Sequence, residues 1–205
     1  MPQVTKIKAQ KNKKRVNLYL DGKFSFGLDA DNFLKARLKI GQKLNQKQID
    51  DLIFKNEFQK SLDRAFRLIS RRPRSEKEIR NYFKKKRSSS KVAEKVIAKL
   101  KELKQIDDRE FARWWVDQRT IFRPRGKYGL TMELRQKGID KTVIKETVES
   151  VSELHLAEKL AQKKLKTYKN LSKNEFYRKM SAFLARRGFS WEVIRTVIDK
   201  YLENW

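Results

Sequence analysis

Lysine and arginine side chains carry most of the chemical capacity of this 205-residue sequence, because they can bind phosphate or carboxylate groups. They number 52 against 25 aspartate and glutamate residues, which leaves a formal charge of +27 at pH 7. Such an excess favours a polyanion or an acidic protein surface as partner. Three clusters are candidates for that contact: Arg71, Arg72, Arg74, Lys84, Lys85 and Lys86; Arg123, Arg125, Lys127, Arg135 and Lys137; and Arg186 with Arg187. For any one of these residues, a solvated helix face is the alternative interpretation.

Residues that could catalyse a reaction are scarce. The sequence has no cysteine and a single histidine, His155, so thiol chemistry, a histidine-based triad and a typical zinc site are excluded. The glycine-rich phosphate-binding motifs G-x-x-x-x-G-K-S/T and G-x-G-x-x-G are both absent from the sequence. The adjacent carboxylates Asp107 and Asp108 fit a helix N-cap better than an acid–base or magnesium site. The sequence therefore predicts no catalytic residue, no metal and no cofactor, and it places His155 at the start of a helix.

Five aromatic residues could stack on nucleic-acid bases, although packing in a core is the favoured interpretation. They are Trp114, Trp115, Tyr128, Trp191 and Trp205. Trp115 falls on the apolar face of its predicted helix. Trp114 is one residue further round that helix, which leaves it for the surface or for a contact between modules.

The first 50 residues predict a small β-rich unit. Two alternating apolar segments flank the turn dipeptide Asp21-Gly22: Val16, Leu18 and Leu20 before it, and Phe24, Phe26 and Leu28 after it. A two-residue loop would put these two sets on opposite faces. We therefore expect a three-residue loop with Gly22 left-handed, which pairs Leu18 with Phe24 and Val16 with Phe26. A third strand at residues 4–8 and short helices after Asp29 and Asn45 complete the unit.

The remainder of the chain repeats itself with a period of 51 and then 50 residues. Matching apolar positions are Ile79, Leu130 and Met180; Phe83, Leu134 and Leu184; and Ile97, Val148 and Ile198. This pattern predicts a mainly α fold in which three tandem three-helix repeats form an extended curved array after the β-hairpin unit. The predicted boundaries are residues 1–53 for that unit and 54–105, 106–152 and 153–205 for the repeats.

Capping residues support these helices. Ser75, Asp107 and Ser172 each precede a glutamate by three residues, and Asp140 and Ser190 begin further helices. Gly138 and Gly188 stand where a left-handed residue would end the second helix of a repeat. In the first repeat Arg87 occupies that position, so we expect either a steric cost or a rebuilt turn.

No segment predicts a membrane protein or an exported one. The sequence has no run of 18 apolar residues, and no apolar stretch follows the amino-terminal Met1-Pro2. We expect a soluble, cytoplasmic monomer.

Four segments in order resemble the RecX family of regulatory proteins: residues 70–80 (SRRPRSEKEIR), 106–116 (IDDREFARWWV), 134–140 (LRQKGID) and 184–190 (LARRGFS). The resemblance covers residues 55–205, and the amino-terminal hairpin is similar to an extension of longer members. It implies a bacterial cytosolic protein of tandem three-helix repeats that acts in DNA repair, recombination and the SOS response. Its implied partner is the RecA recombinase filament on single-stranded DNA, whose ATP hydrolysis, strand exchange and co-protease function it restrains. It implies no enzymatic activity and no cofactor.

The residues also allow a second function class. Three-helix units with basic turns resemble helix-turn-helix modules, so the chain could bind single- or double-stranded DNA on its own. An RNA-associated role rests on the charge alone. Binding to naked DNA, compared with binding to the filament, separates these alternatives.

Overall fold

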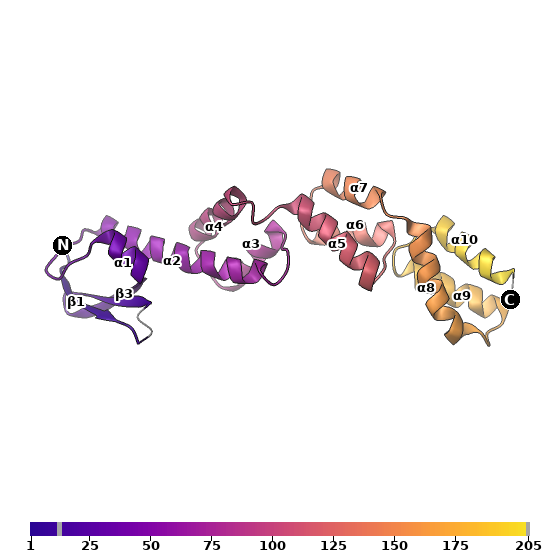
Figure 1. The fold of residues 1–205 in the computed structure, drawn as a ribbon, viewed down its shortest axis with the longest axis horizontal. Coiled ribbons are helices and arrows are strands. Elements are labelled where there is room, and N and C mark those ends of the chain that lie inside the picture. Colours follow the sequence, from indigo (N-terminus) through magenta and orange to yellow (C-terminus); the bar gives the residue numbers. More distant parts are fainter. Residues whose placement is uncertain (12–13, 204–205) are drawn as a thin grey trace. The chain divides into compact units, whose positions relative to one another are not determined.

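The computed structural model describes residues 1–11 and 14–203, which contain three strands and ten helices (Figure 1). They divide into two compact units. The first comprises Met1–Arg72 and Ile79–Gln105, and the second comprises Pro73–Glu78 and Ile106–Trp205. The predicted mainly α fold with an amino-terminal β element is confirmed, while the extended, curved arrangement of the repeats stays a prediction.

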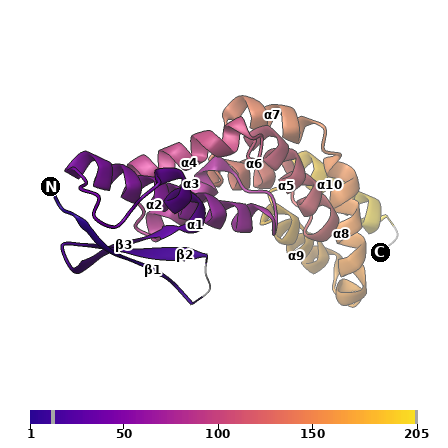
Figure 2. The same ribbon diagram turned by 60° about the vertical axis from the view of Figure 1, so that its left-hand side comes forward.

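The amino-terminal sheet is antiparallel, with the order β1 (Val4–Ala9), β2 (Arg15–Leu20), β3 (Lys23–Asp29). Helices α1 (Ala30–Ala36) and α2 (Gln46–Ile69) contact it and lie over one face (Figure 2). That face is apolar: Val4, Leu18 and Leu28 are at most 1% exposed and pack with Leu52 of α2. The third strand and the helix after Asp29 are therefore where the sequence predicted them.

The hairpin loop differs from the prediction. Leu20 pairs with Lys23, so the loop is the two-residue Asp21-Gly22, and both residues have positive φ (46° and 79°). A β-bulge opposite Leu18 and Tyr19 brings Leu18, Phe26 and Leu28 to the same buried face instead, because one extra residue on β3 shifts the register. Leu18 then pairs with Phe26 rather than Phe24 and both are buried, while Phe24 pairs with Tyr19 and is 58% exposed. The three-residue loop was wrong.

Helix α2 is also longer than expected. The sequence predicts a short helix after Asn45 followed by a separate first helix of the repeat, but one 24-residue helix covers both. It begins with a capping box between Asn45 and Gln48 and contains neither glycine nor proline to end it. Its length would suit a membrane span, yet charged residues run along it, and no helix in residues 1–11 and 14–203 is both long and apolar enough to cross a bilayer.

The remaining helices follow the repeat. In the first unit they are α3 (Glu76–Lys85), whose first turn belongs to the second unit, and α4 (Ser90–Glu102). The second unit holds α5 (Asp108–Phe122), α6 (Lys127–Gln136), α7 (Lys141–Glu149), α8 (Glu153–Tyr168), α9 (Lys173–Ala185) and α10 (Trp191–Leu202). The matched residues Ile79, Leu130 and Met180 are all 0% exposed, so the repeat in the sequence is a repeat of core positions.

The predicted caps and turns are confirmed. Asp107, Asp140, Ser172 and Ser190 each accept a hydrogen bond from the first turn of their helix, and Ser75 Oγ accepts one from Glu78 N. Gly138, Gly188 and Arg87 all have positive φ, at 83°, 77° and 51°. After each of them the next N–H donates to the carbonyl five residues earlier: Ser88 to Phe83, Ile139 to Leu134 and Phe189 to Leu184. The first repeat therefore keeps the turn and places arginine in a conformation that favours glycine.

Replacing Arg87 with glycine is expected to raise the free energy of unfolding by about 0.5–1 kcal/mol. A residue with a Cβ in the left-handed conformation costs about 1–2 kcal/mol, and glycine removes that cost. Part of the stabilisation is lost again because glycine has more conformational freedom in the unfolded chain. Urea unfolding followed by circular dichroism measures the difference. Arg87→Ala is the control, because it removes the charge but keeps the Cβ; equal stabilisation by both variants would contradict a backbone origin.

Candidate nucleic-acid interface

The structure brings two of the predicted basic clusters together inside the second unit. Arg125 Nη1 donates a hydrogen bond to the carbonyl oxygen of Arg186 (3.4 Å), and Gly126 N donates to that of Arg187 (3.0 Å). The segment that opens α6 thus lies directly against the turn between α9 and α10. We call this contact the α6 joint.

Glycine makes the α6 joint possible. A Cβ on Gly126 would lie 2.2 Å from the carbonyl oxygen of Gly188, and a Cβ on Gly129 would lie 2.5 Å from that of Arg187. Atoms cannot approach so closely, so the two backbones can touch only where side chains are missing. The joint is therefore specified by residues that the sequence alone marks only as turn or helix positions.

A carboxylate completes the α6 joint. Glu153 Oε1, from the first turn of α8, accepts hydrogen bonds from Lys127 N (3.0 Å) and Ser190 N (3.1 Å). Gly126 makes no side-chain cap for α6, so Glu153 supplies one from another helix. One half-buried acid therefore satisfies backbone donors at the starts of α6 and α10.

The α6 joint concentrates positive charge. Burial lowers the pKa of the Arg187 guanidinium, and the nearby charges of Arg125 and Arg186 lower it further. Arg125 Nε also lies 3.3 Å from Glu133, which offsets part of this repulsion. The arrangement can bind an anion, because a phosphate or carboxylate would reduce the remaining repulsion among the three arginines.

A corresponding contact, the α3 joint, occurs where Pro73–Glu78 meets the turn after α6. Ser75 Oγ donates to the carbonyl oxygen of Lys137 (2.8 Å), and Glu76 N donates to Asp108 Oδ1 (2.8 Å). Glu76 and Lys127 are 51 residues apart, and Lys137 and Arg187 are 50 apart, so these contacts match those of the α6 joint. Asp107 is the N-cap of α5 that the sequence predicted, whereas its neighbour Asp108 accepts the hydrogen bond from Glu76 N in the α3 joint.

Lys137 has less capacity to bind an anion than the sequence suggested. Its Nζ lies 2.5 Å from Glu78 Oε1 and 4.5 Å from the centre of the Trp115 ring. Arg74 Nη1 lies 3.8 Å from Glu78 as well. The other members of the first cluster are Arg71 and Lys84–Lys86, which are exposed, and Arg72, which is half-buried.

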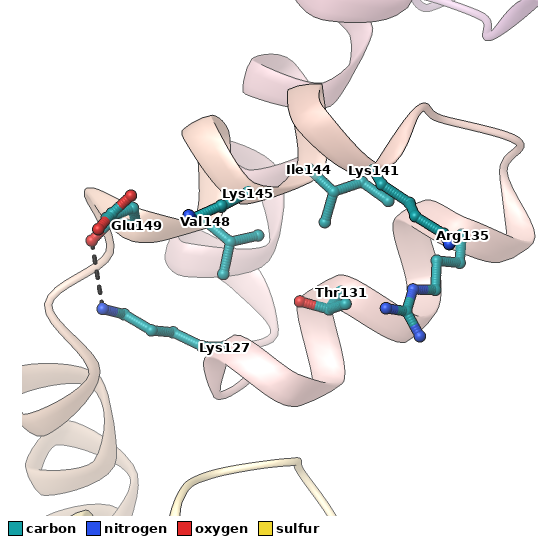
Figure 3. Close-up of a pocket in the computed structure, with 8 residues that line it drawn as sticks. All are labelled: Lys127, Thr131, Arg135, Lys141, Ile144, Lys145, Val148 and Glu149. Atoms are coloured by element: carbon teal, nitrogen blue, oxygen red, sulfur yellow. Dashed lines mark hydrogen bonds between the residues drawn. The ribbon is translucent and has the colours of Figure 1, made fainter.

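Helices α6 and α7 form a groove of about 340 Å³ that contains two of the predicted residues, Lys127 and Arg135 (Figure 3). Lys141 and Lys145 approach it from α7, and Ile144 and Val148 lie between the helices. Lys127 Nζ donates to the carbonyl oxygen of Glu149 (3.2 Å). Lys141 and Lys145 were not among the predicted contact residues, because they do not lie in a basic run. Their four-residue spacing nevertheless places them on one helix face.

Two of the aromatic residues lie outside the core, contrary to the favoured interpretation. Tyr128 is 68% exposed and Trp191 is 59% exposed. The repeat already indicated an exposed position for Tyr128, because the matched residues in the other two repeats are Lys77 and Arg178, which are charged. Trp114 and Trp115 are half-buried, and both ring centres lie 5.8 Å from that of Phe111. Trp205 lies outside the described residues.

The arrangement offers cations and exposed aromatics. Arg123 and Arg186 are exposed beside the α6 joint, and exposed Phe122 and Tyr128 flank the same loop in the sequence. In the described part of the chain, no three histidine, cysteine, aspartate or glutamate residues are grouped so that they could hold a metal ion. His155 is exposed in the first turn of α8, as predicted.

Family models match most of the chain. They are the "Regulatory protein RecX N-terminal domain" at residues 2–45 and the first, second and third three-helix domains of RecX at residues 62–100, 107–148 and 152–198. Among curated relatives, the regulatory protein RecX of Bacillus subtilis (strain 168) is 38% identical over 98% of this chain and 77% of its own length. That of Clostridium tetani (strain Massachusetts / E88) is 32% identical over 97% of this chain and 94% of its own length.

Solved structures agree with these matches. A crystal structure of regulatory protein RecX superposes with a TM-score of 0.73 and 29% identity, covering 97% of this chain and 100% of that one. RecX from Lactobacillus salivarius, at 22% identity and a TM-score of 0.62, covers 70% of this chain and 96% of its own and supports the fold.

Proposed function

The chain belongs to the RecX family of regulatory proteins, and from this premise we propose that it binds the RecA recombinase filament on single-stranded DNA and restrains its activity. The regulated activities are ATP hydrolysis, strand exchange and co-protease function. The protein acts in the cytoplasm as a monomer, without catalysis and without a cofactor.

One observation carries the proposal: the α6 joint gathers Arg125, Arg186 and Arg187 at a contact between helices of neighbouring repeats. A corresponding contact at the α3 joint indicates that repeated modules present related surfaces. A filament also repeats, so several weak contacts act together through high effective concentration. Occupying filament surfaces would then hinder DNA exchange without any chemical step.

The predicted site residues lie in both units, and each remains a proposed contact with the filament or its DNA. They are Arg71, Arg72, Arg74, Lys84, Lys85, Lys86, Arg123, Arg125, Lys127, Arg135, Lys137, Arg186 and Arg187. Arg123 and Arg186 are the most suitable for mutation because both side chains are exposed. Arg125 is less suitable because its side chain also holds the α6 joint, and Lys127 because its Nζ donates to the carbonyl oxygen of Glu149.

The protein is expected to inhibit RecA ATP hydrolysis on single-stranded DNA well below one molecule per recombinase monomer, because each bound molecule would obstruct a cooperative polymer. The charge-reversal variant Arg123→Glu/Arg186→Glu should inhibit much less. Lys163→Glu/Arg178→Glu is the matched control, with the same charge change on exposed residues of the second unit. Hydrolysis is measured against added protein at fixed DNA and RecA concentrations.

The second candidate function is stand-alone nucleic-acid binding, which the charge of +27 and exposed Tyr128 favour. It makes a different prediction in the same titration. Inhibition would then appear only once the protein has coated the free DNA, and that result would contradict the filament proposal.

A further inference from the structure

Two adjoining hollows in the first unit share a wall on α2. Lys60 and Arg64, which are four residues apart, line both of them. One hollow, of about 710 Å³, extends towards the sheet, and the other, of about 430 Å³, extends towards the turn before α4. We call the pair the α2 channel. Its seven basic residues come from three parts of the fold: Lys14, Arg15, Lys60, Arg64, Arg67, Lys86 and Arg87.

The positive charge of the α2 channel is poorly neutralised. Within residues 1–11 and 14–203, no carboxylate oxygen lies within 4.0 Å of a charged nitrogen of Lys60, Arg64, Lys86 or Arg87. Glu57, Asp29 and Asp63 also line the channel, so three acids face seven basic residues. Burial lowers the pKa of Lys60, and the charges of Arg15 and Arg64 lower it further, while Glu57 and Asp29 act in the opposite direction. A bound anion would offset the repulsion.

Hydrogen-bond donors are available in the same place. Arg15 Nε is buried and has no hydrogen-bond partner, although Arg15 Nη2 donates to the carbonyl oxygen of Gly27 (2.8 Å). Ser88 and Ser89 line the second hollow, and Ser89, the N-cap of the 13-residue helix α4, makes no side-chain cap bond. Hydroxyl groups, guanidinium groups and a helix N-terminus are together the donors that bind phosphate oxygens.

We propose that the α2 channel binds phosphate groups of a nucleic-acid backbone, with Lys60 and Arg64 as its central contacts. A single phosphate would engage two or three of the seven cations, whereas two adjoining hollows suit consecutive phosphates of a strand. Among these cations the sequence marked only Lys86 as a binding residue. The channel gives the amino-terminal unit a role of its own, which does not depend on binding to a recombinase.

Arg87 links this site to the strained turn. Glycine would suit the left-handed position better, yet the arginine there lines the channel. Arg87→Gly should therefore weaken nucleic-acid binding while the fold is at least as stable as before. Strain retained at a binding site is a common form of compromise between stability and function.

The test measures binding of a fluorescent oligothymidine to the full chain by anisotropy at several salt concentrations, with no recombinase present. Lys60→Gln/Arg64→Gln should weaken binding and reduce the log–log salt slope by about 1.4, which is two contacts at about 0.7 each on single strands. Lys47→Gln/Lys55→Gln makes the same charge change elsewhere on α2, away from the hollows, and should change the slope much less. Equal slopes for the two double variants would overturn the proposal.

A competition assay distinguishes the source of the phosphate. Inorganic tripolyphosphate should displace the oligothymidine from the wild-type protein only at high concentration, and this displacement should weaken in Lys60→Gln/Arg64→Gln. If that variant loses tripolyphosphate binding but keeps full oligothymidine affinity, the channel is a site for free polyphosphate and the proposal is wrong. Lys60→Gln/Arg64→Gln removes repulsion and Arg87→Gly removes backbone strain, so unfolding would not explain a loss of binding in either variant. Because RecA is absent, failure here leaves the filament proposal to its own titration.

Discussion

Replacing Glu153 with alanine is expected to lower the free energy of unfolding by about 2–3 kcal/mol. The carboxylate accepts from Lys127 N and Ser190 N, so its loss leaves two backbone donors without their partner at the starts of α6 and α10. Hydrogen bonds to a charged group contribute about 1.5–3 kcal/mol each, so two of them in a fully buried site would contribute about 3–6 kcal/mol. Glu153 is only half-buried, so water can partly replace the lost carboxylate, and the expected total falls to about 2–3 kcal/mol. Urea unfolding followed by circular dichroism measures the change.

Glu158 provides the matched control on the same helix. Its Oε1 lies 2.7 Å from Lys200 Nζ, in an exposed ion pair of the kind that contributes about 0–1 kcal/mol. Glu158→Ala should therefore change stability by much less than Glu153→Ala. Glu153→Gln keeps an acceptor without the charge and should fall between them. Equal losses for the two alanine variants would show that Glu153 is an ordinary surface acid.

The Gly129→Ala variant is expected to destabilise the protein by about 1–3 kcal/mol, which is the usual cost of forcing a methyl group into packed structure. The direction is informative, because glycine inside a helix costs about 1 kcal/mol relative to alanine and propensity alone predicts stabilisation. The added Cβ would lie 2.5 Å from the carbonyl oxygen of Arg187, so α6 and the α9–α10 turn must move apart.

Gln136→Ala, on an exposed position at the end of α6, serves as the control for helix propensity. It should be neutral or slightly stabilising. Thermal unfolding of both variants reports the difference, and hydrogen exchange at Gly126 N and Gly129 N reports opening of the α6 joint itself. Stabilisation by Gly129→Ala would mean that the two backbones are not in contact, and the α6 joint would have to be abandoned.

The sequence by itself determined the features that depend on neighbours along the chain. The offsets of 51 and 50 residues identified matching core positions, because each repeat buries the same face of its helices. The caps at Asp107, Asp140, Ser172 and Ser190 and the left-handed turns at Gly138 and Gly188 are local arrangements, fixed by residues within one helical turn. At Arg87 the sequence left two outcomes open, and the structure shows that the left-handed turn is kept. Such signals survive in a single sequence because their geometry does not depend on the rest of the fold.

The tertiary structure alone decided the features that join distant residues. The bulge that sets the hairpin register depends on how β2 and β3 face the core, and the unbroken α2 depends on packing against both the sheet and α4. Glu153 meets Lys127 and Ser190, and Lys60 and Arg64 meet Arg15 and Arg87, across dozens of residues of intervening chain. Charge and glycine content appear in the sequence, but repulsion and close approach depend on distances that only the folded chain fixes.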